Sequence, residues 1–229
     1  VLGTGLFIAV LSVRDSVQTT VDSFLRFHQY DVRINFDRPY RLAQIEQIAL
    51  ETPGVVAVEA WNTGSAQRVR PDGTESDAIS LQAAPADSAL MDPPLEDGRW
   101  LQPTDSYAIV VNTDFMDDEP DVQVGDEIRL NINGRENDWQ IVGVVRSTSS
   151  GPFVFLTNDD YAYVTRNIGQ ANTVRVITAN HDLKSQEETA VLLSTSFQNA
   201  GLRIAGSRAT EEIREQADFQ FNIVVGFLV

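Results

Sequence analysis

Apolar and polar residues alternate at both ends of the central part of the chain, in the order strand, helix, strand. Over residues 30–36 every second position is apolar, which is typical of a half-buried strand. A helical pattern follows at residues 41–51 and ends at Pro53-Gly54, and a second strand is predicted at residues 55–60. A short hairpin, residues 67–69 with 78–82, is predicted around the Pro71-Asp72-Gly73 turn.

The same order returns late in the chain. Residues 173–178 alternate like the first strand, a helix is predicted over residues 185–199, and Gly201 ends it before a strand at residues 202–205. Two strand-helix-strand units side by side form a ferredoxin-like split α/β sandwich, with both helices on one face of an antiparallel sheet. We therefore expect an α+β fold.

The segment between these units, residues 85–170, has the pattern of a β-rich subdomain. The expected strands are residues 107–112, 127–132, 139–145 and 152–156. Turns are predicted at Val124-Gly125-Asp126 and at Asn133-Gly134, the latter a strong hairpin signal. A short helix is expected to begin near Asn158-Asp159. This segment is predicted to be inserted into the α/β part.

Both termini are apolar and uncharged, at residues 1–13 and 219–229. A membrane-spanning helix needs about 20 apolar residues, so each run corresponds to about half of one. We expect residues 1–13 to be the end of one span and residues 219–229 the start of the next. The alternative is that the two runs pair as a buried helical hairpin in a soluble protein.

The segments next to these runs are predicted to be amphipathic helices. Apolar residues recur on one helical stripe from Val13 to His28, and again from Ala209 to Phe221. Ser207 or Thr210 can cap the second helix at its N-terminus. We therefore expect two stalk helices that rise from the membrane and carry the domain between them.

The composition adds four points to this picture. The 42% apolar and 22% charged residues indicate a globular chain, and the net charge of −16 argues against a nucleic-acid partner, because binding phosphates needs clustered Lys and Arg. Residues 84–127 hold 12 acidic residues against the single base Arg99, which indicates a solvated acidic face or a surface that steers partners. The absence of cysteine excludes disulfides and thiol chemistry.

Candidate chemistry in the sequence is sparse. His28 and His181 are the two histidines, and we expect both to be surface or capping residues rather than catalytic bases or metal ligands. The carboxylate clusters at residues 117–121 and at Asp159-Asp160 lack the spacing of a calcium loop and are predicted to be solvated loops or helix caps. Gly3-Thr4-Gly5 does not continue into a dinucleotide motif, and the chain has no P-loop. No catalytic, cofactor-binding or metal residues are therefore predicted.

Four short motifs in a fixed order carry a family resemblance. They are Gly98-Arg99-Trp100-Leu101, Val110-Val111-Asn112, Val124-Gly125-Asp126 with Ile128 and Leu130, and Ile141-Val142-Gly143-Val144-Val145. Their order between two apolar ends resembles the MacB-like periplasmic core domain of FtsX-like ABC transporter permeases. In that family the domain lies between the first and second transmembrane helices.

The resemblance implies a division of the chain and a set of partners. A porter-like α/β subdomain would comprise residues 30–84 and 171–206, with a sabre-like β-rich subdomain at residues 85–170; residues 1–29 and 207–229 would be the stalks and the adjoining spans. It also implies a non-enzymatic domain outside the inner membrane, in a homo- or heterodimeric permease driven by a cytoplasmic ATP-binding subunit or domain. A periplasmic adaptor protein is a further candidate partner.

Two other functions remain open at the level of sequence. The chain could be the ligand-binding ectodomain of a two-span receptor such as a sensor kinase, or, with less support, a soluble secreted hydrolase. Relatives of the permease family serve antibiotics, toxins, peptides and lipoproteins, and no residue pattern here selects among these substrates.

Overall fold

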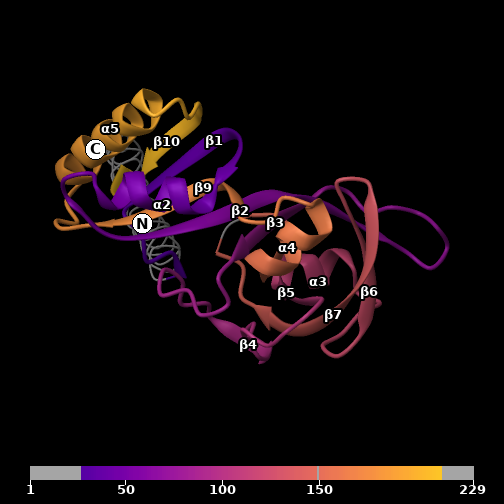
Figure 1. Ribbon diagram of the computed structural model, residues 1–229. Helices are drawn as coiled ribbons and strands as arrows, with labels where there is room; N and C mark the ends of the chain where they lie inside the picture. Colours follow the sequence, from indigo (N-terminus) through magenta and orange to yellow (C-terminus); the bar gives the residue numbers. More distant parts are fainter. Residues whose placement is uncertain (1–26, 149, 213–229) are drawn as a thin grey trace, which may run out of the picture.

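The computed structural model describes residues 27–148 and 150–212. In this part the chain forms two lobes that share one long strand, β2 (Val55–Val69) (Figure 1). None of the helices in the described ranges is both long and apolar enough to cross a membrane. The two predicted half-spans and most of both predicted stalk helices lie outside the described residues.

The first lobe, called here the α/β lobe, has a four-stranded antiparallel sheet in the order β10-β1-β9-β2. Its elements besides the N-terminal half of β2 are β1 (Val32–Arg41), α2 (Leu42–Leu50), β9 (Gln170–Thr178), α5 (Leu183–Asn199) and β10 (Ile204–Ala209). The strands of the two strand-helix-strand units interleave, because β9 lies between β1 and β2, and β1 lies between β9 and β10. The predicted split α/β arrangement is therefore confirmed.

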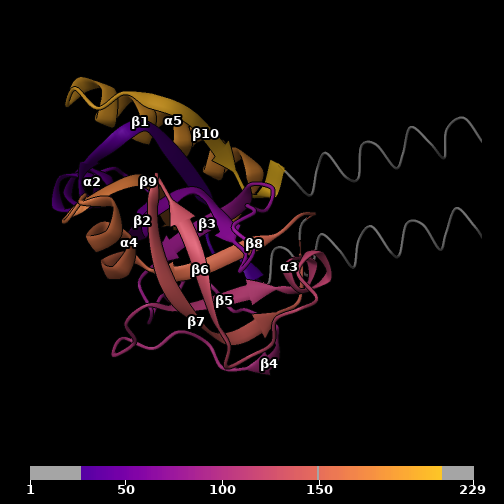
Figure 2. The same cartoon turned by 90° about the vertical axis from the view of Figure 1, so that its right-hand side faces the viewer.

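The core of the α/β lobe follows directly from the alternation in β1. Val32, Ile34 and Phe36 are buried while the residues between them are partly exposed. These side chains pack under α2 and α5, and the rings of Phe36 and Phe197 meet edge to face at 5.0 Å. Figure 2 shows α5 along the outer side of β1 and β10, with the strands of the second lobe below.

The second lobe, called here the barrel lobe, is a closed ring of six strands. In order around the ring these are the C-terminal half of β2, β3 (Ile79–Ala84), β8 (Phe153–Thr157), β5 (Ala108–Asn112), β7 (Arg135–Val145) and β6 (Glu127–Ile132), which pairs back to β2. A further strand, β4 (Leu95–Gly98), pairs with β7. Closure leaves these six strands without a free edge along the ring, which removes the risk of edge-to-edge aggregation.

Two short helices accompany the barrel. The helix predicted near Asn158 is confirmed as α4 (Asn158–Thr165), and the Thr157 side chain caps it by accepting a hydrogen bond from the Asp160 N–H. The helix α3 (Thr113–Asp118) and the strand β4 were not predicted. Asn112 caps α3 through a hydrogen bond from the Phe115 N–H, and Phe115 is fully buried in the barrel core.

The prediction of two separate strands at residues 55–60 and 67–69 was wrong, because β2 continues through the polar residues between them. The Asn62 side chain is held by the carbonyl of Gln170, and the Thr63 N–H donates to Asn172 of β9. Gly64 makes room for Tyr161, whose hydroxyl would lie 3.1 Å from a Cβ at this position. The predicted division near residues 85 and 170 stays a prediction; strands from the two sides of residue 85 pair with one another in the barrel lobe.

The described residues correct the inner ends of both predicted stalk helices. Residues 207–209 belong to β10 rather than to a helix, because they continue the pairing with β1 as far as the pair Val32 and Ala209. Helical conformation begins at Glu211. At the other end His28 is not helical but forms a β-bridge with Met91.

Candidate functional site

The first and last described segments of the chain lie side by side at one end of the α/β lobe. We call residues 27–31 the entry segment and residues 210–212 the exit segment. The entry segment leads into β1 and the exit segment follows β10, and these strands are antiparallel neighbours (Figure 1). The Thr210 N–H donates to the Asp31 carbonyl at 2.7 Å, so the two segments are joined directly.

The Asp31 carboxylate is the centre of this junction. Its side chain is only 10% exposed, and it accepts hydrogen bonds from the backbone N–H of Thr178 at 2.7 Å and from the Thr178 hydroxyl at 3.0 Å. The Gln186 amide donates to it at 2.9 Å, and His181 Nδ1 lies 2.9 Å away. The junction thus ties the entry segment to the end of β9 and to the start of α5.

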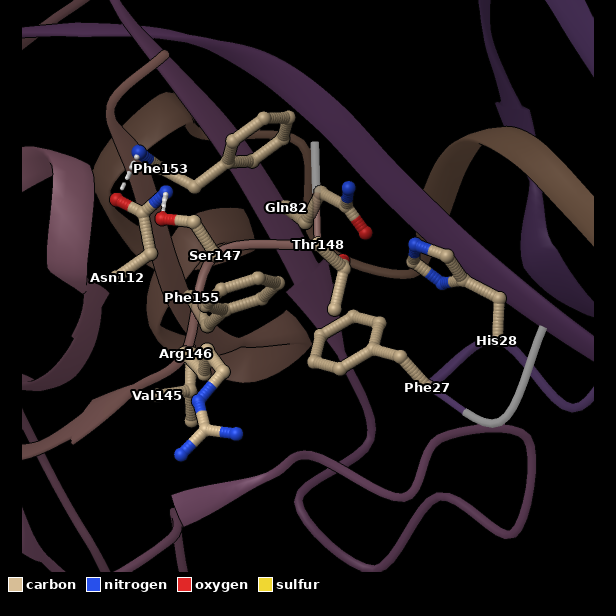
Figure 3. A pocket seen from close by; sticks show the side chains of 10 residues that line it. All are labelled: Phe27, His28, Gln82, Asn112, Val145, Arg146, Ser147, Thr148, Phe153 and Phe155. Atoms are coloured by element: carbon tan, nitrogen blue, oxygen red, sulfur yellow. Dashed lines mark hydrogen bonds between the residues drawn. The ribbon is translucent and has the colours of Figure 1, made fainter. Parts of the chain in front are cut away.

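The entry segment also contacts the barrel lobe. The ring of Phe27 packs against Phe155 of β8 with the ring centres 5.7 Å apart (Figure 3). Beside these rings is a cavity of about 20 Å³, where Asn112 binds Ser147 at 2.9 Å and accepts from the Phe153 N–H at 2.8 Å. A cavity of this size holds one water molecule. The entry segment therefore touches both lobes, while the cavity is too small for an organic ligand.

A buried arginine lies between the two lobes. The guanidinium of Arg175 on β9 is stacked 3.5 Å from the centre of the Trp61 ring and 4.7 Å from that of Tyr30. One of its nitrogens donates to Gln82 at 2.7 Å, whereas Nε and Nη1 have no hydrogen-bond partner among the described residues. Burial lowers the pKa of Arg175 to about 10. No sequence pattern singled out this residue, although a charged residue between Val174 and Val176 was a usable signal.

The prediction that His28 is a surface or capping residue was wrong. His28 is buried between Phe27 and Tyr30, and burial, followed by the charges of Arg175 and Arg33, holds the pKa of His28 well below its ordinary value of 6.5. The helical stripe suggested an exposed stalk position, but the chain leaves the helix here and turns into the lobe interface. His181 has a 70% exposed side chain, in agreement with its predicted surface position.

One member of the acidic cluster at residues 117–121 was also misplaced by the sequence analysis. The Glu119 side chain is only 4% exposed and lies 2.5 Å from both Arg68 and Arg70, and Asp121 binds Arg68 as well. Both arginines lie some 50 positions earlier in the chain, on or next to β2, so their proximity follows from the fold alone. Through these ion pairs Glu119 holds the C-terminal end of α3 against the barrel.

Among the described residues no group of three or more potential ligands is placed to hold a metal ion.

The barrel brings two of the sequence motifs together. Gly98 of β4 pairs with Gly143 of β7. A Cβ on Gly143 would lie 2.2 Å from the Arg99 carbonyl oxygen, and a Cβ on Gly98 would lie 2.3 Å from that of Val142. Only glycine fits at either position, which gives the glycines of these two motifs a physical reason.

The comparisons with known proteins agree with this architecture. The family model of the MacB-like periplasmic core domain matches residues 1–217. The fold is similar to the periplasmic region of MacB from Actinobacillus actinomycetemcomitans, with a TM-score of 0.57, 12% identity and coverage of 83% of this chain and 92% of that one. It is also similar to the extracellular domain of the noncanonic ABC-type transporter YknZ from Gram-positive bacteria, with a TM-score of 0.54, 13% identity and coverage of 78% and 98%. The comparison with curated proteins gives no match.

At such low identity the solved structures support the fold alone, whereas the family match extends over most of the sequence. The match includes the apolar first run and the two glycine motifs of the barrel. The chain therefore belongs to the MacB-like periplasmic core domain family and is the periplasmic domain of an ABC transporter permease.

Proposed function

We propose that this domain transmits ATP-driven conformational change from the membrane to partners or substrates outside the inner membrane. The observation that best supports the proposal is the junction of the entry and exit segments. Both ends of the described chain meet at Asp31 and Thr210, and both are hydrogen-bonded into the same lobe. A displacement of either end would therefore move the whole α/β lobe with it.

The domain is expected to move as a rigid body in this mechanism. Packed interfaces and hydrogen-bonded sheets shift between discrete arrangements rather than bending continuously. The driving energy would come from a cytoplasmic ATP-binding subunit or a fused domain, in a permease that works as a homo- or heterodimer. An adaptor protein outside the membrane is a further proposed partner.

The receptor alternative has weaker support. A ligand-binding ectodomain needs a cavity that encloses its ligand, commonly several hundred Å³. The cavity beside the entry segment has room for one water, and a larger cavity at the barrel, lined by Arg70, Phe115 and Glu119 among others, has a volume of about 190 Å³, which is still below that range. The experiment below separates the two functions, because a receptor domain would not respond to ATP hydrolysis.

The test uses the complete permease with its ATPase, reconstituted in nanodiscs. A fluorophore on Asn199→Cys, an exposed position at the end of α5, reports movement. Residues 1–229 contain no cysteine that would compete for the label, and any cysteine elsewhere in the permease or its ATPase is first replaced by serine. We expect its signal to change on addition of ATP. Ile213→Pro or Val21→Pro, in the predicted stalks outside the described residues, should abolish this change and transport, because proline breaks a helix interior.

The matched controls are Ile213→Ala and Val21→Ala, which remove the same side chains and keep a helix-compatible backbone. These variants should retain the ATP-dependent signal. Circular dichroism should show that the domain stays folded in all four variants. Normal transport by a folded proline variant, or a parent protein whose label never responds to ATP, would refute the proposed function.

A further inference from the structure

The exit segment is held by a side chain from another part of the chain. The Glu211 N–H, at the first helical residue after β10, donates to Gln186 Oε1 at 2.9 Å. The first N–H groups of a helix have no partner within the helix and are usually satisfied by a side chain just before it. Here the partner is supplied by α5, 25 residues earlier in the chain.

The orientation of the Gln186 amide is determined by its neighbours. Its Nε2 donates to Asp31 Oδ1 at 2.9 Å and to the carbonyl of His181 at 3.1 Å. Because a carboxylate and a carbonyl can only accept, they require the amide nitrogen on their side, which leaves the amide oxygen toward Glu211. Asp31 therefore positions Gln186 for the exit segment.

The surroundings make this arrangement rigid. Gln186 is 2% exposed, and Asp31 is fixed in turn by the N–H and hydroxyl of Thr178. A buried polar network in which each group is satisfied is costly to rearrange, because every broken bond leaves a desolvated partner. The network links the entry segment, the end of β9, α5 and the exit segment in one continuous set of hydrogen bonds.

We propose that Asp31 and Gln186 are positioning residues that couple the exit segment to the α/β lobe, so that movement of the C-terminal stalk is passed to the domain. This inference rests on the proposed function and names the residues through which it acts. Loss of the Gln186–Glu211 bond would leave the domain folded and the Thr210–Asp31 bond in place, while the helix that begins at Glu211 is coupled more weakly to the lobe.

The decisive variant is Glu211→Pro, measured with the Asn199→Cys label in the reconstituted permease. Proline removes the N–H that Gln186 accepts, yet it is compatible with the first position of a helix. The control Glu211→Gln removes the same charge and keeps the N–H. We expect the ATP-dependent signal to fall about fivefold in Glu211→Pro, the equivalent of one buried hydrogen bond, and to be unchanged in Glu211→Gln.

Gln186→Leu and Asp31→Asn test the same network by changing the side chains that hold the Glu211 N–H. Both should reduce the signal while ATP hydrolysis continues, an uncoupling that a purely structural role would not produce. Position 211 lies outside the lobe core. If Gln186→Leu or Asp31→Asn fails to fold, the Glu211→Pro variant therefore still tests the coupling role. An undiminished signal in Glu211→Pro would overturn the coupling role, whereas absence of any ATP response in the parent would instead refute the proposed function.

Discussion

His28, Arg175 and Glu119 are ionisable side chains that the fold buries, and each is accommodated in a different way. Glu119 forms ion pairs with Arg68 and Arg70, each at 2.5 Å. Arg175 has no such ion pair within the part of the chain that the structure describes, and it is stabilised by stacking on Trp61 and by one hydrogen bond to Gln82. His28 is kept neutral. Burial of a charge is expensive without a partner, so these three sites contribute unequally to stability.

The neutral state of His28 predicts a pH dependence. The folded protein holds the pKa of His28 well below 6.5, whereas the unfolded chain binds a proton near 6.5. The unfolded state therefore binds more protons below this pH, and the free energy of unfolding should fall there by up to about 1.4 kcal/mol per pH unit. This stability is complete above pH 6.5 and is lost as the pH falls toward the folded pKa.

Urea unfolding of the chain at about pH 7.5 and about pH 5.5 measures this effect. His28→Gln should flatten the dependence, because it removes the titrating group. His181→Gln, which replaces the exposed histidine, should leave the fall in place. An equally steep fall in His28→Gln would show that other groups cause it.

At the scale of elements, the contact between β4 and β7 depends on two glycines. Gly98 and Gly143 face each other, and neither position has space for a side chain, because backbone oxygens lie where a Cβ would be. Gly98 in addition adopts a φ of 68°, in the left-handed region that favours glycine. The close backbone approach brings the Arg99 segment against the barrel wall.

Gly143→Ala should therefore destabilise the domain by about 3 kcal/mol, because the neighbouring groups are backbone and cannot rotate away. Thermal unfolding followed by circular dichroism measures the change. The matched control is Gly206→Ala in β10, where nothing lies within 4 Å of the added Cβ, and its effect should stay within about 0.5 kcal/mol. Equal stability of both variants would contradict the packing argument.

At the scale of the whole molecule, the two lobes share both a strand and a core. The first half of β2 pairs with β9, and its second half pairs with β3 and β6. Between the lobes lies a third apolar cluster that includes Phe27, Tyr30 and Trp61, with Arg175 against it. Separating the lobes would expose this cluster and split a continuous strand.

The chain is therefore expected to unfold in one cooperative transition. Scanning calorimetry should give a calorimetric enthalpy equal to the van't Hoff enthalpy. Gly143→Ala, which acts only in the barrel lobe, should lower the melting temperature of the α/β lobe as well. Two resolved transitions, with only one of them shifted by the variant, would show that the lobes are independent.

Much of the α/β lobe could be predicted from the sequence, because its strands alternate with period two and its helices end at glycine signals. The strand predicted at residues 30–36 overlaps β1 over residues 32–36, and the helix predicted at residues 185–199 lies within α5. The glycine motifs of the barrel were likewise visible, and so was the family resemblance. These features depend on residues that are close together in the chain, or on the order of such short patterns, so they can be predicted from the sequence.

Only the tertiary structure decided the junction at Asp31, the burial of His28 and Glu119, the position of Arg175 and the closure of the barrel. Each depends on groups far apart in the chain: Asp31 meets Gln186 across 155 residues, and Arg68 meets Glu119 across 51. The polar residues that extend β2 beyond residue 60 are stabilised by partners on β9 in the same way. Periodicity shows which face of an element is buried, but it does not show which element will lie against that face.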